Sequence, residues 1–501
     1  MTIELKKIGV IGAGAMGRGI AQVCAAAGCS VRLFDTAPEA AQRALQAVRD
    51  DLAHAVRKGK LAQPEADVAL SNILPVSGLA DLSGCDMVVE AIVEKLEPKQ
   101  SLLRQLESIV STHCVLATNT SSLSVTAIAA ACAQPDRVAG WHFFNPVARM
   151  RLVEVIQAPR TTVEVVQALV ALSERVGHRA VVVSDSPGFV VNHAGRAFVT
   201  EGLKLLAERT AEHHVIDAIM RNAGFRMGPL ELLDLTALDV SVPVMESIHA
   251  QYYGDDRYRP VALARNRMVA GLLGRKTHQG FYTYENGVQQ QPAMPAVAPI
   301  LQTTCWWPQS GPNALSPELA DLLSTGTRVA DNRFADIVWV APLGADLSST
   351  VVQLGLDPAR VVAIDPVFSS RNGVTLMVSP ATESATIEHA QGLLASQGIP
   401  SFVIADSPGY VAPRVIACII NLACEMAQQG VAKPTDIDAA VRLGLGYPAG
   451  PFEWGDRLGA SRILEILCGL HTTFGDQRYR ASPWLVRRAR LGLSLCAPDR
   501  R

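Results

Sequence analysis

The order of apolar and polar positions predicts alternating buried strands and amphipathic helices at the start of the chain. The run IGVI, from Ile8, is apolar and partly β-branched, which is typical of a buried parallel strand. The next segment, from Met16, has helical periodicity and stops at Gly28. A second strand, SVRLFD, then ends at Asp35. This order predicts the first half of a doubly wound α/β sheet.

The same alternation continues to about residue 186. Further strands are predicted at DMVVEAI (86–92), VLATNTS (115–121), VAGWHFFNP (138–146), LVEVIQ (152–157) and AVVVSD (180–185). Between the second strand and Asp86 lies a long, mostly polar and helical excursion, from Pro38 to Gln63. We therefore expect residues 1–186 to form one Rossmann-like domain.

After this domain the periodicity becomes helical. The pattern from Val190 to about Leu273 predicts an all-α domain, which we place at residues 187–285. A stretch rich in proline and glutamine follows, and it predicts a linker over residues 286–314.

The helical domain is repeated later in the chain. Four motifs recur in the same order at an offset of 221 or 222 residues: SDSPGFVV (184–191) as ADSPGYVA (405–412), DAIM (217–220) as DAAV (438–441), GPLELLD (228–234) as GPFEWGD (450–456) and GDDRYR (254–259) as GDQRYR (475–480). A single offset for all four indicates a duplication. We expect a second helical domain over residues 406–501.

The segment between the two helical copies, residues 315–405, has strand patterns of its own at ADIVWVA (335–341) and RVVAID (360–365). It contains no GxGxxG turn, and AIDPVFS stands where the first domain reads GWHFFNP. We interpret it as a reduced Rossmann-like domain that has lost its ligand and serves as a scaffold.

Composition narrows the function classes. The 501 residues are 49% apolar and 18% charged with a formal net charge of -2, which supports large cores and gives no electrostatic reason to expect nucleic acid or an anionic membrane as partner. The ten cysteines include no CxxC pair, so we expect reduced thiols and a soluble, cytoplasmic protein. The first strand begins too early for a signal peptide, and the apolar run from Arg414 is too short to span a bilayer.

The first turn predicts a dinucleotide site. Gly12 permits the tight turn, Gly14 lets the backbone approach a pyrophosphate, and Gly17 lets helix and strand pack closely. The helix begins at Ala15 and Met16 and offers free N–H groups to phosphates. The alternative is a structural glycine turn without a cofactor.

Asp35 selects the form of the cofactor. Its carboxylate would accept hydrogen bonds from the adenosine ribose and repel a 2′-phosphate, and the next two residues, Thr36 and Ala37, offer no arginine. The sequence therefore predicts NAD rather than NADP.

Polar residues gather at the ends of later strands, where a doubly wound sheet binds its ligands. His142 alone would more often be a structural histidine, but Glu154 lies inside an apolar strand where a carboxylate needs a partner. If the loop NPVARM turns the chain back, that strand brings Glu154 beside the imidazole. Such a pair predicts a general base, in which the glutamate fixes the tautomer of the histidine.

With these motifs in place, the chain resembles the 3-hydroxyacyl-CoA dehydrogenase family. The resemblance rests on IGAGAMG, VVEAIVE, NTSSL, HFFNPV, LVEVI, DSPGFVVN and GPLELLD. It runs from Lys7 to about Tyr284 and, through the duplication, from about Pro358 to Arg488. It implies oxidation of an L-3-hydroxyacyl-CoA to a 3-ketoacyl-CoA, with hydride transfer to NAD.

The resemblance also implies roles for individual residues. His142 would be the general base, Glu154 its orienting partner, and Ser121 a hydrogen-bonding group at the reacting oxygen. Asn192 would help to position the substrate, and Lys58, in a basic cluster that could equally be a solvated face, would lie near CoA. The implied contacts to the dinucleotide are Glu90, Lys95, Asn119, Asn145 and Lys276.

Two positions depart from the family pattern. His193 stands where an arginine usually follows the asparagine, and His278 replaces a glycine in RKTHQGFY. Both put the local loop geometry in question, although neither removes a catalytic group. His213 and His214 are adjacent near a predicted helix start, where we expect exposure rather than metal binding, and we expect no metal site.

The duplicated layout resembles longer bacterial members that act on 3-hydroxybutyryl-CoA or, in aromatic-acid degradation such as the phenylacetate route, on 3-hydroxyadipyl-CoA. Family members often pair through the helical domain, so the second copy could mimic that partner within one chain, and a homodimer or higher oligomer is the other option. Two further functions stay open: a catalytically silent structural or binding protein on this fold, and another NAD-dependent β-hydroxyacid dehydrogenase that uses a lysine base.

Overall fold

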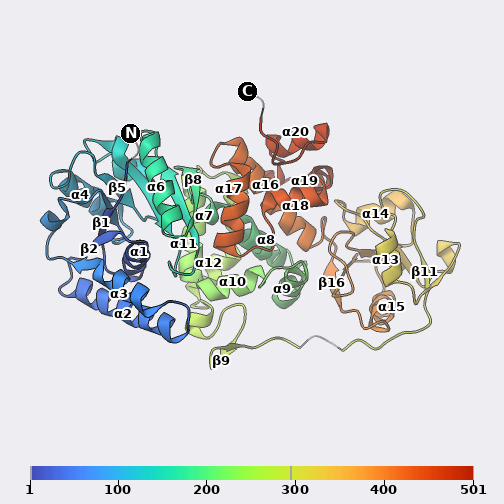
Figure 1. Cartoon of the computed structure of the whole chain (residues 1–501). Helices are drawn as coiled ribbons and strands as arrows, with labels where there is room; N and C mark the ends of the chain where they lie inside the picture. Colours follow the sequence, from blue (N-terminus) through green and yellow to red (C-terminus); the bar gives the residue numbers. More distant parts are fainter. Residues whose placement is uncertain (1–2, 294–295, 500–501) are drawn as a thin grey trace. The chain divides into compact units, whose positions relative to one another are not determined.

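The computed structural model describes residues 3–293 and 296–499 of the chain (Figure 1). It divides into two compact units. The first runs to His193 and adds Gln429–Leu445, and the second holds Ala194–Gln428 and the residues from Gly446 onward. Each unit is described by itself below. Within the described residues, no helix combines the length and the apolar character that a bilayer crossing requires.

The first unit is built on an eight-stranded sheet in the order β3-β2-β1-β4-β5-β6-β7-β8. Every neighbouring pair is parallel except β6 and β7, which are antiparallel. The strands are β1 (Lys7–Ile11), β2 (Ser30–Phe34), β3 (Ile73–Pro75), β4 (Met87–Glu90), β5 (Val115–Thr118), β6 (Val138–Phe143), β7 (Leu152–Gln157) and β8 (Arg179–Ser184). The doubly wound sheet expected from the sequence is confirmed.

Helices connect and cover these strands. They are α1 (Ala15–Ala26), α2 (Ala40–Arg57), α3 (Gln63–Ser71), η1 (Leu79–Leu82), α4 (Leu96–Glu107), α5 (Val125–Ala129), η2 (Pro135–Arg137), α6 (Val163–Arg175) and α7 (Val191–Ala194), together with α17 (Pro434–Ala440) and the π-helical η7 (Val441–Leu445) from the C-terminal part. Helix α2 lies within the predicted polar excursion and α3 begins at its last residue, Gln63; both helices are drawn in blue in Figure 1.

The core of this unit forms because both sheet faces are covered. Successive residues of β1 point to opposite faces, and both Val10 and Ile11 are buried, each in a different apolar cluster. Helix α1 buries Ile20, Ala21 and Cys24 on one side. Burial of this apolar surface supplies the main driving force for folding the unit.

One strand was not predicted from the sequence. β3 extends the sheet edge beside β2 after the helical excursion. It is three residues long and ends in a proline, Pro75, so it carries no alternating pattern of useful length. Its place is set by tertiary pairing with β2 rather than by local sequence.

The second unit contains two groups of helices. The first group comprises α8 (Arg196–Ala207), α9 (His213–Asn222), α10 (Pro229–Thr236), α11 (Leu238–Gln251), η3 (Asp256–Tyr258), α12 (Ala262–Val269) and η4 (Arg275–Thr277), followed by the hairpin β9 (Tyr284–Glu285) and β10 (Val288–Gln289). The second comprises α16 (Ala412–Gln428), α18 (Pro451–Leu458), α19 (Ala460–Phe474), η8 (Gln477–Tyr479) and α20 (Pro483–Leu491).

A second, six-stranded sheet lies between these groups in the sequence, in the order β12-β11-β13-β14-β15-β16. Its elements are β11 (Thr304–Trp306), α13 (Pro317–Leu322), β12 (Thr327–Arg328), η5 (Asn332–Phe334), β13 (Ile337–Val340), α14 (Leu347–Leu354), η6 (Pro358–Arg360), β14 (Val361–Ile364), β15 (Val374–Val378), α15 (Ser384–Ala395) and β16 (Ser401–Ala405). The predicted reduced Rossmann-like segment is confirmed as a fold.

The predicted linker was too long. β11 lies inside residues 286–314 yet pairs with both β12 and β13. Its Cys305 is fully buried in the core of the second sheet, so these residues are structural. The linker therefore ends before Thr304. The linker was predicted from its content of proline and glutamine. That content describes the residues before β11 and does not reveal the three residues of the strand.

The second sheet repeats the strand pair that carries His142 and Glu154 in the first. β14 and β15 are antiparallel with Ile364 opposite Leu376, and the Asp365 N–H donates to the Thr375 carbonyl oxygen at 3.0 Å. Asp365 and Thr375 thus take the places of the histidine and the glutamate. Both members of the pair are lost in the second copy, as the sequence indicated for the histidine.

The domain of the second sheet also packs closely against α19. A Cβ atom on Gly469 would lie 1.9 Å from the Gly344 carbonyl oxygen, and one on Gly344 would lie 2.6 Å from the Glu465 carbonyl oxygen. Backbone therefore touches backbone at this contact, with no space for a side chain between them.

Candidate active site

The strand pair β6–β7 brings together two polar side chains in the first unit. Its antiparallel register sets His142 opposite Glu154, and Nδ1 of the histidine lies 2.7 Å from Oε2 of the glutamate. Both residues are buried, with 4% and 1% of their surface exposed. The chain reversal that the sequence suggested for the loop after β6 is confirmed, and so is the proximity of the two side chains.

Glu154 has two further partners. Its Oε1 accepts the N–H groups of Val190 and Val191, both at 2.9 Å. These residues open α7, so one carboxylate fixes both the imidazole and the segment that leads to Asn192. A buried carboxylate with three hydrogen bonds is held in one orientation.

This contact fixes the chemistry of the histidine. A carboxylate only accepts hydrogen bonds, so the neutral imidazole presents its N–H at Nδ1 and a lone pair at Nε2. The ring packs near Phe144 and Phe189, with centroids 4.5 and 5.9 Å away. The result is an oriented acceptor for one proton in a largely apolar surrounding.

Ser121 follows β5 on an exposed turn that Glu94 holds. The Glu94 Oε1 accepts the N–H groups of Ser121 and Ser122 at 2.7 and 3.0 Å. It also accepts the Ser121 hydroxyl at 3.2 Å and the Thr120 hydroxyl at 2.7 Å. The serine predicted to contact the reacting oxygen is thus positioned by a carboxylate.

The charge on Glu94 is maintained by its surroundings. Burial raises the pKa of this carboxyl, but the hydrogen bond from Thr120 and the charge of Lys99 lower it, and the net effect is a pKa below the ordinary value. The Lys99 Nζ lies 3.3 Å from Oε2. Glu94 is therefore an anion at neutral pH and a strong acceptor for the turn.

Asn192, at the start of α7, also reaches this turn. Its Nδ2 donates to the Ser121 carbonyl oxygen at 3.3 Å. His142, Glu154, Ser121 and Asn192 are accordingly joined by hydrogen bonds, directly or through the backbone of residues 190–191. Their individual catalytic roles stay predictions.

The glycine turn has the geometry that a dinucleotide requires. Gly12 has φ of +97°, and a Cβ on Gly17 would lie 1.7 Å from the Gly12 carbonyl oxygen, so no larger residue fits. Gly14 has open space around it and caps α1 without a side-chain acceptor. The first N–H groups of α1 therefore face outward with no side chain over them.

A groove of about 450 Å³ runs from this turn along α2. Its lining includes Gly14 and Asp35, with Arg18 and Arg43 at its sides. The Asp35 carboxylate accepts the Ala13 N–H at 2.7 Å and the Ala37 N–H at 2.8 Å. Each carboxylate oxygen keeps a further lone pair for a ribose hydroxyl. These residues fit the adenosine half of NAD.

Three of the other predicted dinucleotide contacts are placed at the same edge of the sheet. Asn119 follows β5, and its Oδ1 accepts the Phe143 N–H at 2.9 Å. Asn145 is exposed in the loop after β6, and Lys95 is exposed as the residue that caps α4. Their contact with NAD stays a prediction.

Glu90, another predicted dinucleotide contact, is enclosed by protein groups. Its carboxylate is completely buried and pairs with Lys99 at 2.8 Å, and it also accepts the Thr118 hydroxyl. A side chain enclosed in this way holds β4, β5 and α4 together, and its contact with NAD stays a prediction. The motif VVEAIVE contains two acids, and the structure assigns the open loop to Glu94 instead.

The two predicted lysines have different settings. Lys58 is exposed at the C-terminal end of α2, so its predicted place near CoA stays a prediction. Lys276 belongs to the second unit, where it pairs with Asp239.

The departures from the family pattern are also explained or placed. His278 has φ of +58°, a left-handed conformation that favours glycine, and it follows η4. The glycine of the family pattern therefore answers a backbone requirement that His278 meets with some strain. His193 is fully buried in α7.

The adjacent histidines of α9 contact each other edge to face at 5.3 Å, and burial lowers the pKa of His213. Among the described residues, no cluster of three or more histidine, cysteine or acidic side chains could hold a metal ion.

Sequence reasoning missed Glu94, Lys99 and Asp185. Asp185 accepts the hydroxyls of Ser124 and Thr126 at 2.8 and 2.6 Å and so anchors α5 to β8. A sign was present in each case: an acid or lysine close to a strand end, where a buried charge requires a partner. The sequence does not say which partner.

The sheet, the glycine turn, the acid that closes β2 and the paired histidine define an NAD-dependent dehydrogenase of the doubly wound class. The chain belongs to the 3-hydroxyacyl-CoA dehydrogenase family. The model of the family's NAD-binding domain matches residues 7–186, and the model of its C-terminal domain matches residues 188–284 and again residues 409–494. The second C-terminal match confirms the duplication, and enzymes of this family are oxidoreductases that use NAD.

Individual relatives agree. The chain is 36% identical over 98% of its length to a 3-hydroxyadipyl-CoA dehydrogenase of Escherichia coli, 99% of which is covered. A crystal structure of 3-hydroxybutyryl-CoA dehydrogenase from Escherichia coli matches with a TM-score of 0.86 and 34% identity, covering 97% of this chain and 99% of the other. A probable 3-hydroxybutyryl-CoA dehydrogenase of Bacillus subtilis is 41% identical and covers 56% of this chain and 99% of its own.

Proposed function

We propose that this chain oxidises a short L-3-hydroxyacyl-CoA to the 3-ketoacyl-CoA with NAD, and that His142 is the general base. The observation that carries the proposal is the buried hydrogen bond of 2.7 Å between His142 and Glu154, at the strand ends where this sheet binds its ligands. Bound NAD supplies the hydride acceptor.

The residues divide the remaining work. Nε2 of His142 takes the proton of the 3-hydroxyl, and the Glu154 carboxylate stabilises the imidazolium that forms. Ser121 contacts the reacting oxygen, and Asn192 positions the acyl chain by way of the same turn. In the reverse direction, the imidazolium returns the proton to the oxygen of the 3-keto group.

The acyl group is the finer part of the proposal. Relatives carry the names 3-hydroxybutyryl-CoA and 3-hydroxyadipyl-CoA dehydrogenase, and of the two that match almost the whole chain one is named for the adipyl ester and the other, a solved structure, for the butyryl ester. We therefore propose 3-hydroxybutyryl-CoA or 3-hydroxyadipyl-CoA as the substrate. Measurement of kcat/KM with the butyryl, hexanoyl and adipyl esters orders them, and a preference for the hexanoyl ester would contradict the assignment.

His142→Gln tests the base. Loss of a general base lowers kcat by about 10²–10⁴-fold, whereas NAD affinity should change little because the glycine turn and Asp35 are untouched. Stopped-flow turnover and NAD titration measure the two effects separately. The exposed His113→Gln is the matched control.

Turnover of His142→Gln within tenfold of the native enzyme would remove His142 as the base. No turnover of any CoA ester by the native chain would favour a silent binding protein. Oxidation of free hydroxy acids in preference to CoA esters would favour a β-hydroxyacid dehydrogenase.

We also propose that the second helical copy takes the place of a partner subunit. Contacts between each helical copy and the last strand of the other sheet are reciprocal at the repeat offset: the Ala405 N–H of β16 donates to the Thr210 carbonyl oxygen, and the Ser184 N–H of β8 donates to the Val431 carbonyl oxygen, both at 2.8 Å. Exchange of roles between equivalent positions is the property of a two-fold interface. Sedimentation that showed helical copies joined only between chains would contradict this.

A cytoplasmic location completes the proposal. All ten cysteines are free and eight of them are buried, which suits a reducing compartment. Activity in the cytosolic rather than the membrane or secreted fraction of the source cells tests the location.

A further inference from the structure

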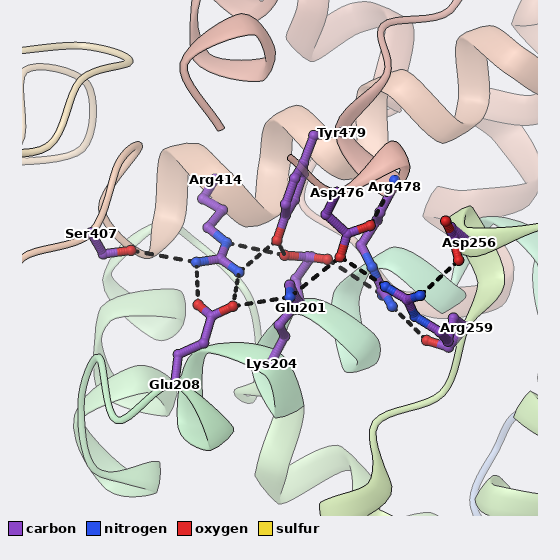
Figure 2. A network of polar contacts seen from close by, with 10 residues as sticks. All are labelled: Glu201, Lys204, Glu208, Asp256, Arg259, Ser407, Arg414, Asp476, Arg478 and Tyr479. Carbon is purple, nitrogen blue, oxygen red and sulfur yellow. Dashed lines mark hydrogen bonds and ion pairs between the residues drawn. The ribbon is translucent and has the colours of Figure 1, made fainter. Parts of the chain in front are cut away.

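A buried cluster of charges joins the two helical copies within the second unit (Figure 2). Its centre is Arg414 on α16, which is fully buried. The guanidinium donates to Glu201 on α8 at 3.1 Å, to Glu208 at the C-cap of α8 at 2.8 Å, and to the Tyr479 hydroxyl at 2.7 Å. One arginine of the second copy thus binds two carboxylates of the first.

At the edge of the same interface, which we call the rim, the ion pairs are reciprocal. Arg259 of the first copy lies 3.1 Å from Asp476 of the second, and Arg480 of the second lies 3.9 Å from Asp255 of the first. Adding 221 to one pair gives the other, so the rim obeys the pseudo-two-fold relation of the duplication. The ion pairs of the rim could therefore form between any two helical copies, and they do not select one pairing.

The centre does not obey this relation. The residue of the first copy at the position of Arg414 is His193, and the residues of the second copy at the positions of Glu201 and Glu208 are Leu422 and Gln429. The arginine and both carboxylates therefore occur on one side of the pseudo-axis only. The two copies have become complementary instead of identical at this point.

Complementarity decides which copies can pair. Two first copies would face each other with buried Glu201 carboxylates and no arginine at the position of Arg414. Two second copies would bury two Arg414 side chains against Leu422 and Gln429, which carry no negative charge. Removing one partner of a buried ion pair leaves an uncompensated charge, which is strongly unfavourable.

Arg478 lies 3.5 Å from Glu201 and has a counterpart in Arg257 of the first copy, so that ion pair could form in either pairing. The contacts of Arg414 with Glu201 and Glu208 are the part of the cluster that only a first copy with a second copy can form.

We propose that the Arg414 cluster makes this pairing exclusive: the surface of the first helical copy takes the second copy of its own chain and rejects the first copy of another chain. The cluster would then convert a surface for homodimers into a surface for one internal partner. The inference refines the proposed internal partner and is independent of the catalytic assignment, because its test does not use turnover.

Chemical cross-linking tests the pairing at the rim. In a background with Cys468→Ser and Cys496→Ser, which leaves buried thiols only, Asp255→Cys and Arg480→Cys are placed in one chain and a short bis-maleimide is added. We expect a link within one chain. An equal mixture of chains that carry either Asp255→Cys or Arg259→Cys tests the contact between two first copies, because Arg259 is the counterpart of Arg480, and it should give almost no covalent dimer. As much dimer from the mixture as internal link from the double variant would overturn the proposal.

Arg414→His tests the centre, because it restores the residue of the first copy. We expect the mixture to give several-fold more covalent dimer than with Arg414 in place. The exposed pair of Arg371 with Asp321 gives the control Arg371→Gln, which should change nothing. Glu208→Gln, at the half-exposed edge of the cluster, is a milder variant in case Arg414→His does not fold. If the variants fold and the mixture gives no more covalent dimer than before, the proposed exclusive pairing is contradicted. The proposal that the second copy is the internal partner would not be affected.

Discussion

Glu94 holds the turn that carries Ser121, and it does so with a full negative charge. Glu94→Gln keeps one carbonyl acceptor but loses the charge that Lys99 faces at 3.3 Å. A charge-assisted hydrogen bond contributes about 1.5–3 kcal/mol, so we expect kcat/KM to fall about 10- to 100-fold. Steady-state kinetics measure the loss, and the exposed Glu97→Gln on α4 is the control.

The pH dependence of this contact has a definite sign. Because the folded pKa of Glu94 is lowered, the contact is fully formed above the ordinary glutamate range and is lost as pH falls through the folded pKa. The difference between native and Glu94→Gln activity should therefore shrink in acid. A difference that grows as pH falls would contradict the assignment.

Asp365 replaces the histidine in the second sheet, and its burial leads us to expect that stability depends on pH. Burial raises the pKa of its carboxyl to about 6, and Oδ2 has no hydrogen-bond partner among the described residues. An unfolded aspartate titrates near 3.9. Between about pH 4 and 6 the folded state holds the extra proton, so stability falls as pH rises through this window.

Asp365→Asn should remove that loss. The amide oxygen can still accept the N–H groups of Val367 and Phe368, which Oδ1 accepts now. We expect a gain of about 2–3 kcal/mol at pH 8 and little or none at pH 4. Thermal unfolding at both pH values measures it, with exposed Asp321→Asn as control. Equal effects at the two pH values would contradict the burial argument.

At the scale of elements, the turn between β1 and α1 sets the cofactor. Asp35→Ser removes the carboxylate that would repel a 2′-phosphate, while Arg18 and Arg43 already line the same groove. We expect weaker NAD binding, by about 10- to 100-fold, and a rise in kcat/KM for NADP relative to NAD. Kinetics with both cofactors measure the ratio, and exposed Asp50→Ser on α2 is the control. An unchanged ratio would show that Asp35 does not select the cofactor.

Elements with a strong local pattern could be predicted from the sequence. The strands around His142 and Glu154 are apolar runs broken by one polar residue each, and the unusual carboxylate indicated the pairing before any coordinates did. Short strands could not be predicted, because β3, at a sheet edge, and β11, between β12 and β13, have three residues each and are held by their neighbours. The different settings of Glu90 and Glu94 also depend on tertiary structure, since Lys99 pairs with both acids but only the Glu94 side chain is partly exposed.

At the scale of the whole molecule, one chain should bind one NAD. The second sheet lacks the glycine turn, and Asp365 and Thr375 replace the histidine and glutamate. Isothermal titration calorimetry should give a stoichiometry near one per 501-residue chain. Gly12→Ala, which places a Cβ 2.6 Å from the Ala91 carbonyl oxygen, should abolish all of it. A second, residual binding site in that variant would show that the C-terminal half retains a cofactor.

The contact between Gly344 and Gly469 has a consequence for motion. Only hydrogen atoms separate these two backbones, so the second sheet and α19 have no room to hinge against each other. The conformational entropy lost in ordering this contact is therefore lost once, when the chain folds. A rearrangement during the catalytic cycle would then leave the second sheet and α19 in one fixed arrangement.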